Sequence, residues 1–177
     1  MVQTEWRTTA AGRAARSAVT LVASALVLTG CVLPEQGAGE PRRAQPVIDA
    51  DAAKQQMVGA VDDVTGRLGD AWKARTGPDY AEDCALPDGA SGAQWVYLVG
   101  SSRTGTPEAD AQDAIDRWKA SGLRPGRWGS GGRPAVLAAG GDQIASISLY
   151  AYSGNYTVQA VSLCFPGDPD ELGRDLE

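Results

Sequence analysis

The 177-residue sequence contains no histidine, only three cysteines and a single phenylalanine. Histidine is the side chain that most often acts as a general base near neutral pH and as a neutral metal ligand. Its absence excludes imidazole-based catalytic triads, and no serine lies in the Ser-x-x-Lys pattern that can replace them. Clusters of thiolates that could bind zinc are also absent from the sequence. We therefore predict a protein that is not an enzyme and that binds no cofactor and no metal.

The first thirty residues have the pattern of a targeting segment rather than of a folded domain. Arg7, Arg13 and Arg16 give it a positive charge, and Ser17 to Thr29 is an uncharged, mostly apolar run of 13 residues. A helix of that length rises about 20 Å, which is less than the roughly 30 Å hydrocarbon core of a membrane. We therefore predict a cleaved signal peptide over these thirty residues, with an uncleaved membrane helix as the alternative.

The end of this segment, Leu28-Thr29-Gly30-Cys31, resembles the lipobox of bacterial lipoproteins, in which an aliphatic and two small residues precede a cysteine. The resemblance implies that the sulfur of Cys31 carries a diacylglyceryl group, that the signal peptide is cleaved before Cys31, and that the new amino group is acylated, for example with palmitate. Two acyl chains suffice for stable anchoring, because each buried CH₂ contributes about 0.8 kcal/mol. The expected location is the extracytoplasmic side of the cell membrane. A buried Cys31 that follows an ordinary secretory signal is the alternative.

Residue usage adds a cue about the source. Only three of the 16 basic residues are lysines, and alanine and glycine are abundant. This usage resembles that of actinobacterial proteins, and the mature part resembles small uncharacterised actinobacterial lipoproteins. That resemblance implies no binding residues.

The net charge is −6, and loss of the arginine-rich leader makes the mature chain more acidic still. A nucleic-acid-binding protein needs a basic face, so we predict no nucleic-acid partner. Asp110, Asp113 and Asp116 share one face of a predicted helix. We interpret them as a solvated acidic face, with a loose calcium site as the alternative.

Two cysteines remain once Cys31 is lipidated. An even pair in an exported domain indicates one disulfide, between Cys84 and Cys164. Two buried thiols or a redox pair are the alternatives. A disulfide that closes so long a loop stabilises the fold by about 4–5 kcal/mol in the chain-entropy model.

The mature chain divides into three parts. Residues 31–46 comprise the lipidated cysteine and a flexible tether rich in Pro and Gly, residues 47–166 form a single α+β domain, and residues 167–177 are a polar acidic tail.

Two helices are predicted. The first begins near Asp49, carries an apolar stripe and ends at Gly77-Pro78. Its stripe consists of Met57, Val61, Val64, Leu68 and Trp72. The second begins at Thr106-Pro107 and ends at Ser121-Gly122, with Ala111, Ala114, Ile115 and Trp118 facing inward. Residues 78–92, including Cys84, are predicted to form a loop.

Four strands are predicted, at 94–101, 134–139, 143–152 and 156–165, and the last two form a hairpin around Gly154. The hairpin register places alternate residues on an inner face, listed as Ile147, Leu149, Ala151, Val158, Ala160, Ser162 and Cys164. The outer face receives Ser146, Ser148, Tyr150, Thr157 and Gln159. We therefore predict a two-layer α+β sandwich of order α-β-α-β-β-β, whose mostly antiparallel four-stranded sheet carries two helices on one face.

One basic segment stands out in the acidic domain. Arg124, Arg127, Trp128 and Arg133 are predicted to form a loop that recognises an envelope glycopolymer or envelope protein, since arginine binds anionic groups and tryptophan stacks on sugars and cations. The wet face of the sheet, with Tyr150, Tyr152, Tyr156 and Gln159, is a second candidate surface. The alternative for the loop is a mobile connection whose arginines pair with nearby aspartates.

We therefore predict a membrane-anchored lipoprotein that serves as a non-catalytic binding or interaction module of the cell envelope. A carrier of a lipid or other apolar ligand is the first alternative, although small Ala and Gly side chains leave little to line a large pocket. An enzyme that uses carboxylates alone is the second.

Overall fold

The computed structural model describes residues 48–129 and 132–172, so the predicted signal peptide, Cys31 and the tether lie outside the described residues. The α+β class is confirmed. In chain order the elements are α1 (Ala50–Leu68), β1 (Lys73–Ala85), β2 (Ser91–Ser101), α2 (Pro107–Ala120), β3 (Arg124–Trp128), β4 (Ala135–Ala139), β5 (Ile144–Tyr152), β6 (Asn155–Ser162) and α3 (Pro169–Leu172).

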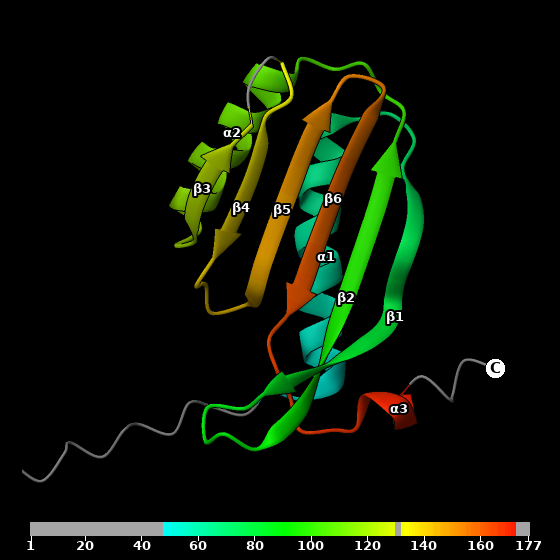
Figure 1. The fold of residues 1–177 in the computed structure, drawn as a ribbon, viewed down its shortest axis with the longest axis vertical. Helices are drawn as coiled ribbons and strands as arrows, with labels where there is room; N and C mark the ends of the chain where they lie inside the picture. The colour runs from blue at the N-terminus through cyan, green and yellow to red at the C-terminus, as the bar shows by residue number, and fades with distance from the viewer. Residues whose placement is uncertain (1–47, 130–131, 173–177) are drawn as a thin grey trace, which may run out of the picture. The chain divides into compact units, whose positions relative to one another are not determined.

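The sheet has six strands in the order β1-β2-β6-β5-β4-β3, and every neighbouring pair is antiparallel (Figure 1). The predicted four-stranded sheet is therefore wrong, because the sequence pattern assigns the residues of β1 to a helix end and a loop, and those of β3 to another loop. Both are edge strands with mostly exposed side chains, so neither shows the alternation of apolar and polar residues that indicates a strand. The register of β1 shifts on either side of Thr76, which lets the strand accommodate Gly77-Pro78.

The first helix is shorter than predicted. Its N-cap is Asp49, whose carboxylate accepts a hydrogen bond of 2.8 Å from the Ala52 N–H. It ends at Leu68 because Gly69 adopts a positive φ of 69° and closes the helix. Trp72 therefore lies beyond the helix, and its indole N–H donates to the Gly69 carbonyl oxygen at 2.8 Å.

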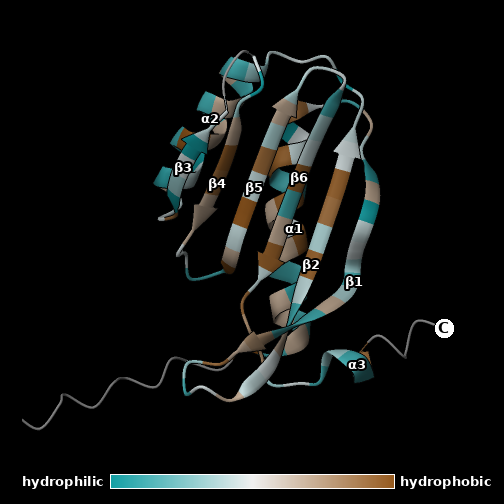
Figure 2. Cartoon of the chain, viewed as in Figure 1, coloured by the Kyte–Doolittle hydropathy of each residue, from teal (hydrophilic) through white to brown (hydrophobic). Residues whose placement is uncertain are grey.

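Both long helices pack on the same face of the sheet. α1 lies against β2, β5 and β6, while α2 lies against β3, β4 and β5 (Figure 1). Figure 2 shows apolar and polar residues alternating along β5, as expected for a strand with one face in the core. The predicted hairpin register is confirmed: Ile147 lies opposite Ala160 and Leu149 opposite Val158. All four are fully or almost fully buried.

The Cys84–Cys164 disulfide is confirmed, with the two Cα atoms 5.9 Å apart. Its position differs from the prediction, which placed Cys84 in a loop and Cys164 on the inner face. Cys84 lies in β1, opposite Gly92 of β2. This position is on the face of the sheet that points away from the helices. The alternation of buried and partly exposed residues along β6 breaks after Ser162. Phe165, three positions further on, is also fully buried and pairs with Ala93 of the core. One residue more than regular alternation allows therefore lies between Ser162 and Phe165, and it turns Cys164 toward Cys84.

The predicted polar tail contains α3. This short helix lies near β1 and β2, and its Leu172 packs against the hydrophobic core. The folded domain therefore includes residues beyond 166.

Candidate functional site

The face of the sheet opposite α1 and α2, called the open face here, carries the clearest group of exposed aromatic residues. Trp128 of β3 lies opposite Ala135, which in turn lies opposite Tyr150 of β5. The Trp128 and Tyr150 ring centroids are 5.8 Å apart at 84°, and Tyr150 and Tyr152 are 6.2 Å apart at 87°. Trp128 is 43% exposed and Tyr150 is 36% exposed, whereas Ala135 between them is fully buried. We call Trp128, Tyr150 and Tyr152 the aromatic strip.

A mixed polar and apolar row runs beside the strip. Leu137, Ser148, Gln159 and Leu98 lie opposite one another across β4, β5, β6 and β2. Leu137 is exposed, while Gln159 is half-buried at the centre of the row. The structure therefore brings Tyr150, Tyr152 and Gln159 onto one surface and adds Trp128 to it. The prediction is wrong for Tyr156, which lies opposite Ala151 and is fully buried in the core.

The predicted basic loop does not exist as one unit, because strand β3 divides its side chains between two faces. Arg127 pairs in register with the buried Val136 and forms an ion pair with Glu108 of α2, so it belongs to the helix side. Arg124 shares the face of Trp128, and its guanidinium lies against the backbone of Gly140. Arg133 is exposed just before β4.

Sequence reasoning missed one arginine on the open face. The guanidinium of Arg75 lies against Gly100, where any Cβ would collide with it, and its Nη2 donates to Asn155 Oδ1 at 3.0 Å. Gly100 lies opposite Thr157, which lies opposite Tyr150. Arg75 therefore stands at the far end of the sheet row that contains Tyr150. Gly100 is the only sequence signal for this contact. Without the β1–β2 pairing, a glycine at this position does not identify Arg75 as its neighbour.

A second polar cluster surrounds Asp110, which was predicted to face solvent but has a side chain only 14% exposed. Its Oδ2 accepts hydrogen bonds from the Tyr156 hydroxyl at 2.7 Å, from Arg103 Nη1 at 2.9 Å and from the Thr106 N–H at 3.0 Å. Burial by itself would raise the pKa of Asp110, but the hydrogen bonds from Tyr156 and Thr106 and the charge of Arg103 lower it below its ordinary value.

The hydrogen bond that helps to lower the pKa of Asp110 acts on the pKa of Tyr156 in the opposite direction. Burial, together with the hydrogen bond to Asp110 and its negative charge, raises the pKa of the Tyr156 hydroxyl well above its ordinary value. The guanidinium of Arg103 also lies 4.7 Å from the centre of the Tyr156 ring. Because these groups are already bonded to one another, we interpret the cluster as a structural link between the segment that connects β2 to α2, the first turn of α2, and β6.

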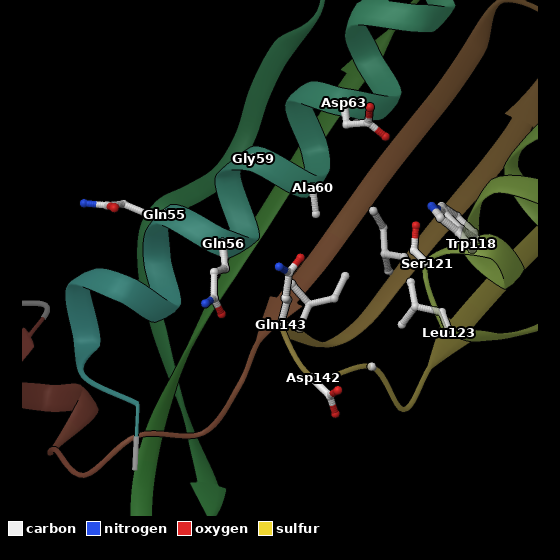
Figure 3. Close-up of a pocket in the computed structure, with 13 residues that line it drawn as sticks. Gln55, Gln56, Gly59, Ala60, Asp63, Trp118, Ser121, Leu123, Asp142 and Gln143 are labelled. Carbon is white, nitrogen blue, oxygen red and sulfur yellow. The ribbon is translucent and has the colours of Figure 1, made fainter. Parts of the chain in front are cut away.

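A groove of about 820 Å³ lies between α1 and α2 on the helix side of the sheet. Figure 3 shows α1 on one side and Trp118, Ser121 and Leu123 on the other, with Gln143 rising between them. The residues that line it are both polar and apolar, among them Gln56, Asp142, Leu123 and Ile144.

Within residues 48–129 and 132–172, no group of three or more Cys, Asp or Glu side chains converges to hold a metal ion. The same residues include no helix with the length and apolar character that crossing a membrane requires.

Comparison with known proteins gives one match. No protein-family model matches the sequence, and no curated protein matches it significantly. Among solved structures, the chain is similar to the crystal structure of a DUF4853 family protein from Actinomyces odontolyticus, with a TM-score of 0.43 and 12% sequence identity. The match covers 67% of this chain and 66% of that chain, just under two thirds of its length. A likeness of this degree assigns neither a family nor a function.

Proposed function

We propose that this chain is a lipoprotein, anchored through Cys31 on the extracytoplasmic side of the cell membrane, whose folded domain binds an envelope glycopolymer through the open face. The leader and the Leu28-Thr29-Gly30-Cys31 motif support the anchor. The Cys84–Cys164 disulfide is consistent with folding in an oxidising compartment.

The aromatic strip is the observation that carries the binding proposal. Exposed tryptophan and tyrosine on a rigid sheet provide apolar surface at a small cost in conformational entropy, and their rings can stack on the C–H faces of sugars. Trp128 and Tyr150 lie side by side on a face that neither α1 nor α2 covers. Arg75 and Arg124 flank the strip with guanidinium donors suited to hydroxyl or anionic groups.

Retention of the full-length, detergent-solubilised protein on purified envelope glycopolymer tests this proposal. We expect the double variant Trp128→Ala/Tyr150→Ala to bind at least about tenfold more weakly. Arg127→Ala is the matched control, because Arg127 neighbours Trp128 in sequence but pairs with Glu108 on the helix side. We expect its retention to be unchanged. Equal retention of the double variant and the unmodified protein would exclude the open face as the contact.

The anchor has its own test. We expect the mature protein to begin at Cys31, to show the mass of an acyl modification there, and to accumulate unprocessed when the lipoprotein signal peptidase is inhibited with globomycin. An unmodified Cys31 in the membrane fraction would contradict lipid anchoring while leaving the binding proposal to stand on the retention assay.

A further inference from the structure

One row of residues crosses the open face from β3 to β1, over the six strands shown in Figure 1. The residues in register along it are Trp128, Ala135, Tyr150, Thr157, Gly100 and Lys73. Adjacent strands lie about 4.8 Å apart, so the row is about 24 Å long. We call it the cross-strand row. It begins at the aromatic strip and ends at a basic side chain.

An irregularity in β1 places a second basic group in this row. The register shifts between Ala74 and Thr76, so Arg75 pairs with no residue of β2. The guanidinium of Arg75 instead occupies the space above Gly100, where a Cβ would collide with it. Gly100 therefore leaves its place in the cross-strand row to Arg75, two strand spacings or about 10 Å from Tyr150.

Arg75 is exposed and keeps most of its hydrogen-bonding capacity free. A guanidinium has five N–H donors. Among the described residues, Arg75 makes one hydrogen bond, to Asn155 Oδ1 at 3.0 Å, and no ion pair. Lys73 and Arg124 also belong to the open face, and within the same described ranges neither forms an ion pair. The acidic residue of β1 on this face, Glu82, lies opposite Gln94, beyond the irregular part of the strand.

Arginines elsewhere in the domain behave differently. Four of them form ion pairs with aspartate or glutamate, namely Arg67, Arg103, Arg117 and Arg127. Acidic side chains outnumber basic ones by 22 to 16 in the sequence, so a shortage of carboxylates does not explain why Arg75 lacks one. The fold therefore presents an unneutralised guanidinium beside an aromatic surface.

We propose that the glycopolymer bound by the open face is anionic, and that it lies along the cross-strand row with sugar rings on the aromatic strip and a carboxylate or phosphate group at Arg75. This inference rests on the proposed function and narrows it to negatively charged polysaccharides. A guanidinium binds the oxygens of either anion through paired N–H groups. The separation of about 10 Å between Tyr150 and the place of Arg75 exceeds the width of one sugar ring, so a polymer rather than a monosaccharide would contact both.

Retention of the full-length, detergent-solubilised protein on two fractions of envelope glycopolymer tests this inference. Anion exchange separates the polymer into an anionic and a neutral fraction, and we expect at least about tenfold stronger retention on the anionic one. Equal retention on both fractions would overturn the inference while leaving the proposed function intact. Absence of retention on either fraction would overturn the proposed function as well.

Reducing the carboxyl groups of the anionic fraction to alcohols distinguishes the two sources of negative charge. Loss of retention after reduction identifies a carboxylate as the group bound at Arg75. Unchanged retention, still sensitive to substitution of Arg75, identifies a phosphate.

Arg75→Gln locates the charge that is recognised. We expect it to weaken retention on the anionic fraction at least about tenfold and to leave retention on the neutral fraction unchanged. Lys119→Gln is the matched control, because Lys119 is an exposed basic residue of α2 that forms no ion pair among the described residues. It removes the same charge from the other side of the sheet. Equal effects of the two variants on the anionic fraction would contradict the role of Arg75.

Gly100→Ala tests the position of Arg75 while keeping every charge. The new Cβ would fill the place of the guanidinium, which is the end of a flexible side chain and can move aside. We therefore expect a small change in melting temperature but weaker retention on the anionic fraction. Unchanged retention, with the melting temperature preserved, would contradict the placement of Arg75 in the cross-strand row.

Discussion

The hydrogen bond between Tyr156 and Asp110 gives a sharp test of how the domain is held together. Tyr156 is fully buried, and its hydroxyl donates at 2.7 Å to a carboxylate that is only 14% exposed. Hydrogen bonds to charged groups contribute about 1.5–3 kcal/mol. Asp110 keeps its bonds from Arg103 and Thr106 when the hydroxyl is removed, so the carboxylate is not left unpaired. We therefore expect Tyr156→Phe to lower the free energy of unfolding by about 2 kcal/mol at pH 7.

Removing the carboxylate itself should cost more. In Asp110→Ala, the Arg103 side chain, which is only 10% exposed, loses its least exposed partner, and the Tyr156 hydroxyl loses its acceptor. Breaking a buried pair from one side typically costs about 3–5 kcal/mol. Because both substitutions remove the same hydrogen bond, the double variant should be less destabilised than the sum of the two single variants.

The pH dependence follows from the directions of the two pKa shifts. The folded-state pKa of Asp110 is lowered from 3.8, so its stabilisation is complete above that pH and is lost as pH falls through the folded-state pKa. The pKa of Tyr156 is raised from 10.0, so its contribution is complete below pH 10 and is lost as pH rises toward the folded-state pKa. The cost of Tyr156→Phe should therefore fall by about half at low pH, where the hydrogen bond becomes neutral.

Urea unfolding followed by circular dichroism, with the disulfide intact, measures these free energies. One series is measured at pH 7 and the other at a pH below the folded-state pKa of Asp110. The unmodified protein is measured at both pH values, so that general acid destabilisation is subtracted. A cost of Tyr156→Phe below about 0.5 kcal/mol at pH 7 would refute the assigned strength of the bond. The same cost at both pH values would refute the role of the Asp110 charge.

Two further experiments probe the disulfide and the backbone. Replacing both Cys84 and Cys164 by alanine should lower stability by about 4–5 kcal/mol, given a sequence separation of 80, and the loss should appear in the urea midpoint. Gly105 has a φ of 51°, and a Cβ there would lie 2.5 Å from the Tyr156 hydroxyl. Gly105→Ala should therefore cost at least about 2 kcal/mol, combining left-handed strain with overpacking. Gly122→Ala is the control with a φ of 81° and open space, and thermal melting should show a loss of only about 1 kcal/mol.

The sequence predicts the elements whose signals are local. Asp49 and Thr106-Pro107 indicate the two helix starts, and the turn at Gly154 fixes the β5–β6 register. That register alone placed Tyr150 and Gln159 on the outer face of the sheet, and the structure confirms this placement. Helix stripes and hairpins are short-range patterns, so a single sequence contains them.

The missed elements depend on contacts between distant residues. β1 and β3 are paired on one side only, and their residues, such as Pro125 and Gly126, have no strand preference of their own. Without β1, Cys84 falls in a loop and Arg75 falls at the end of the predicted first helix. Without β3, nothing in the sequence indicates that Trp128 lies beside Tyr150, because β4 connects them across the sheet.

Strand β5 separates the hydrophobic core from the proposed binding surface. Its odd-numbered residue Ile147 lies in the core, whereas its even-numbered residue Tyr150 belongs to the aromatic strip. A shift of one residue in the β5–β6 register would exchange the two faces, exposing apolar core residues and burying Tyr150. The Tyr152–Asn155 pairing at the hairpin turn prevents that shift. The turn therefore keeps the aromatic strip on the open face and the apolar residues of β5 in the core, so the strip depends on the same register as the core.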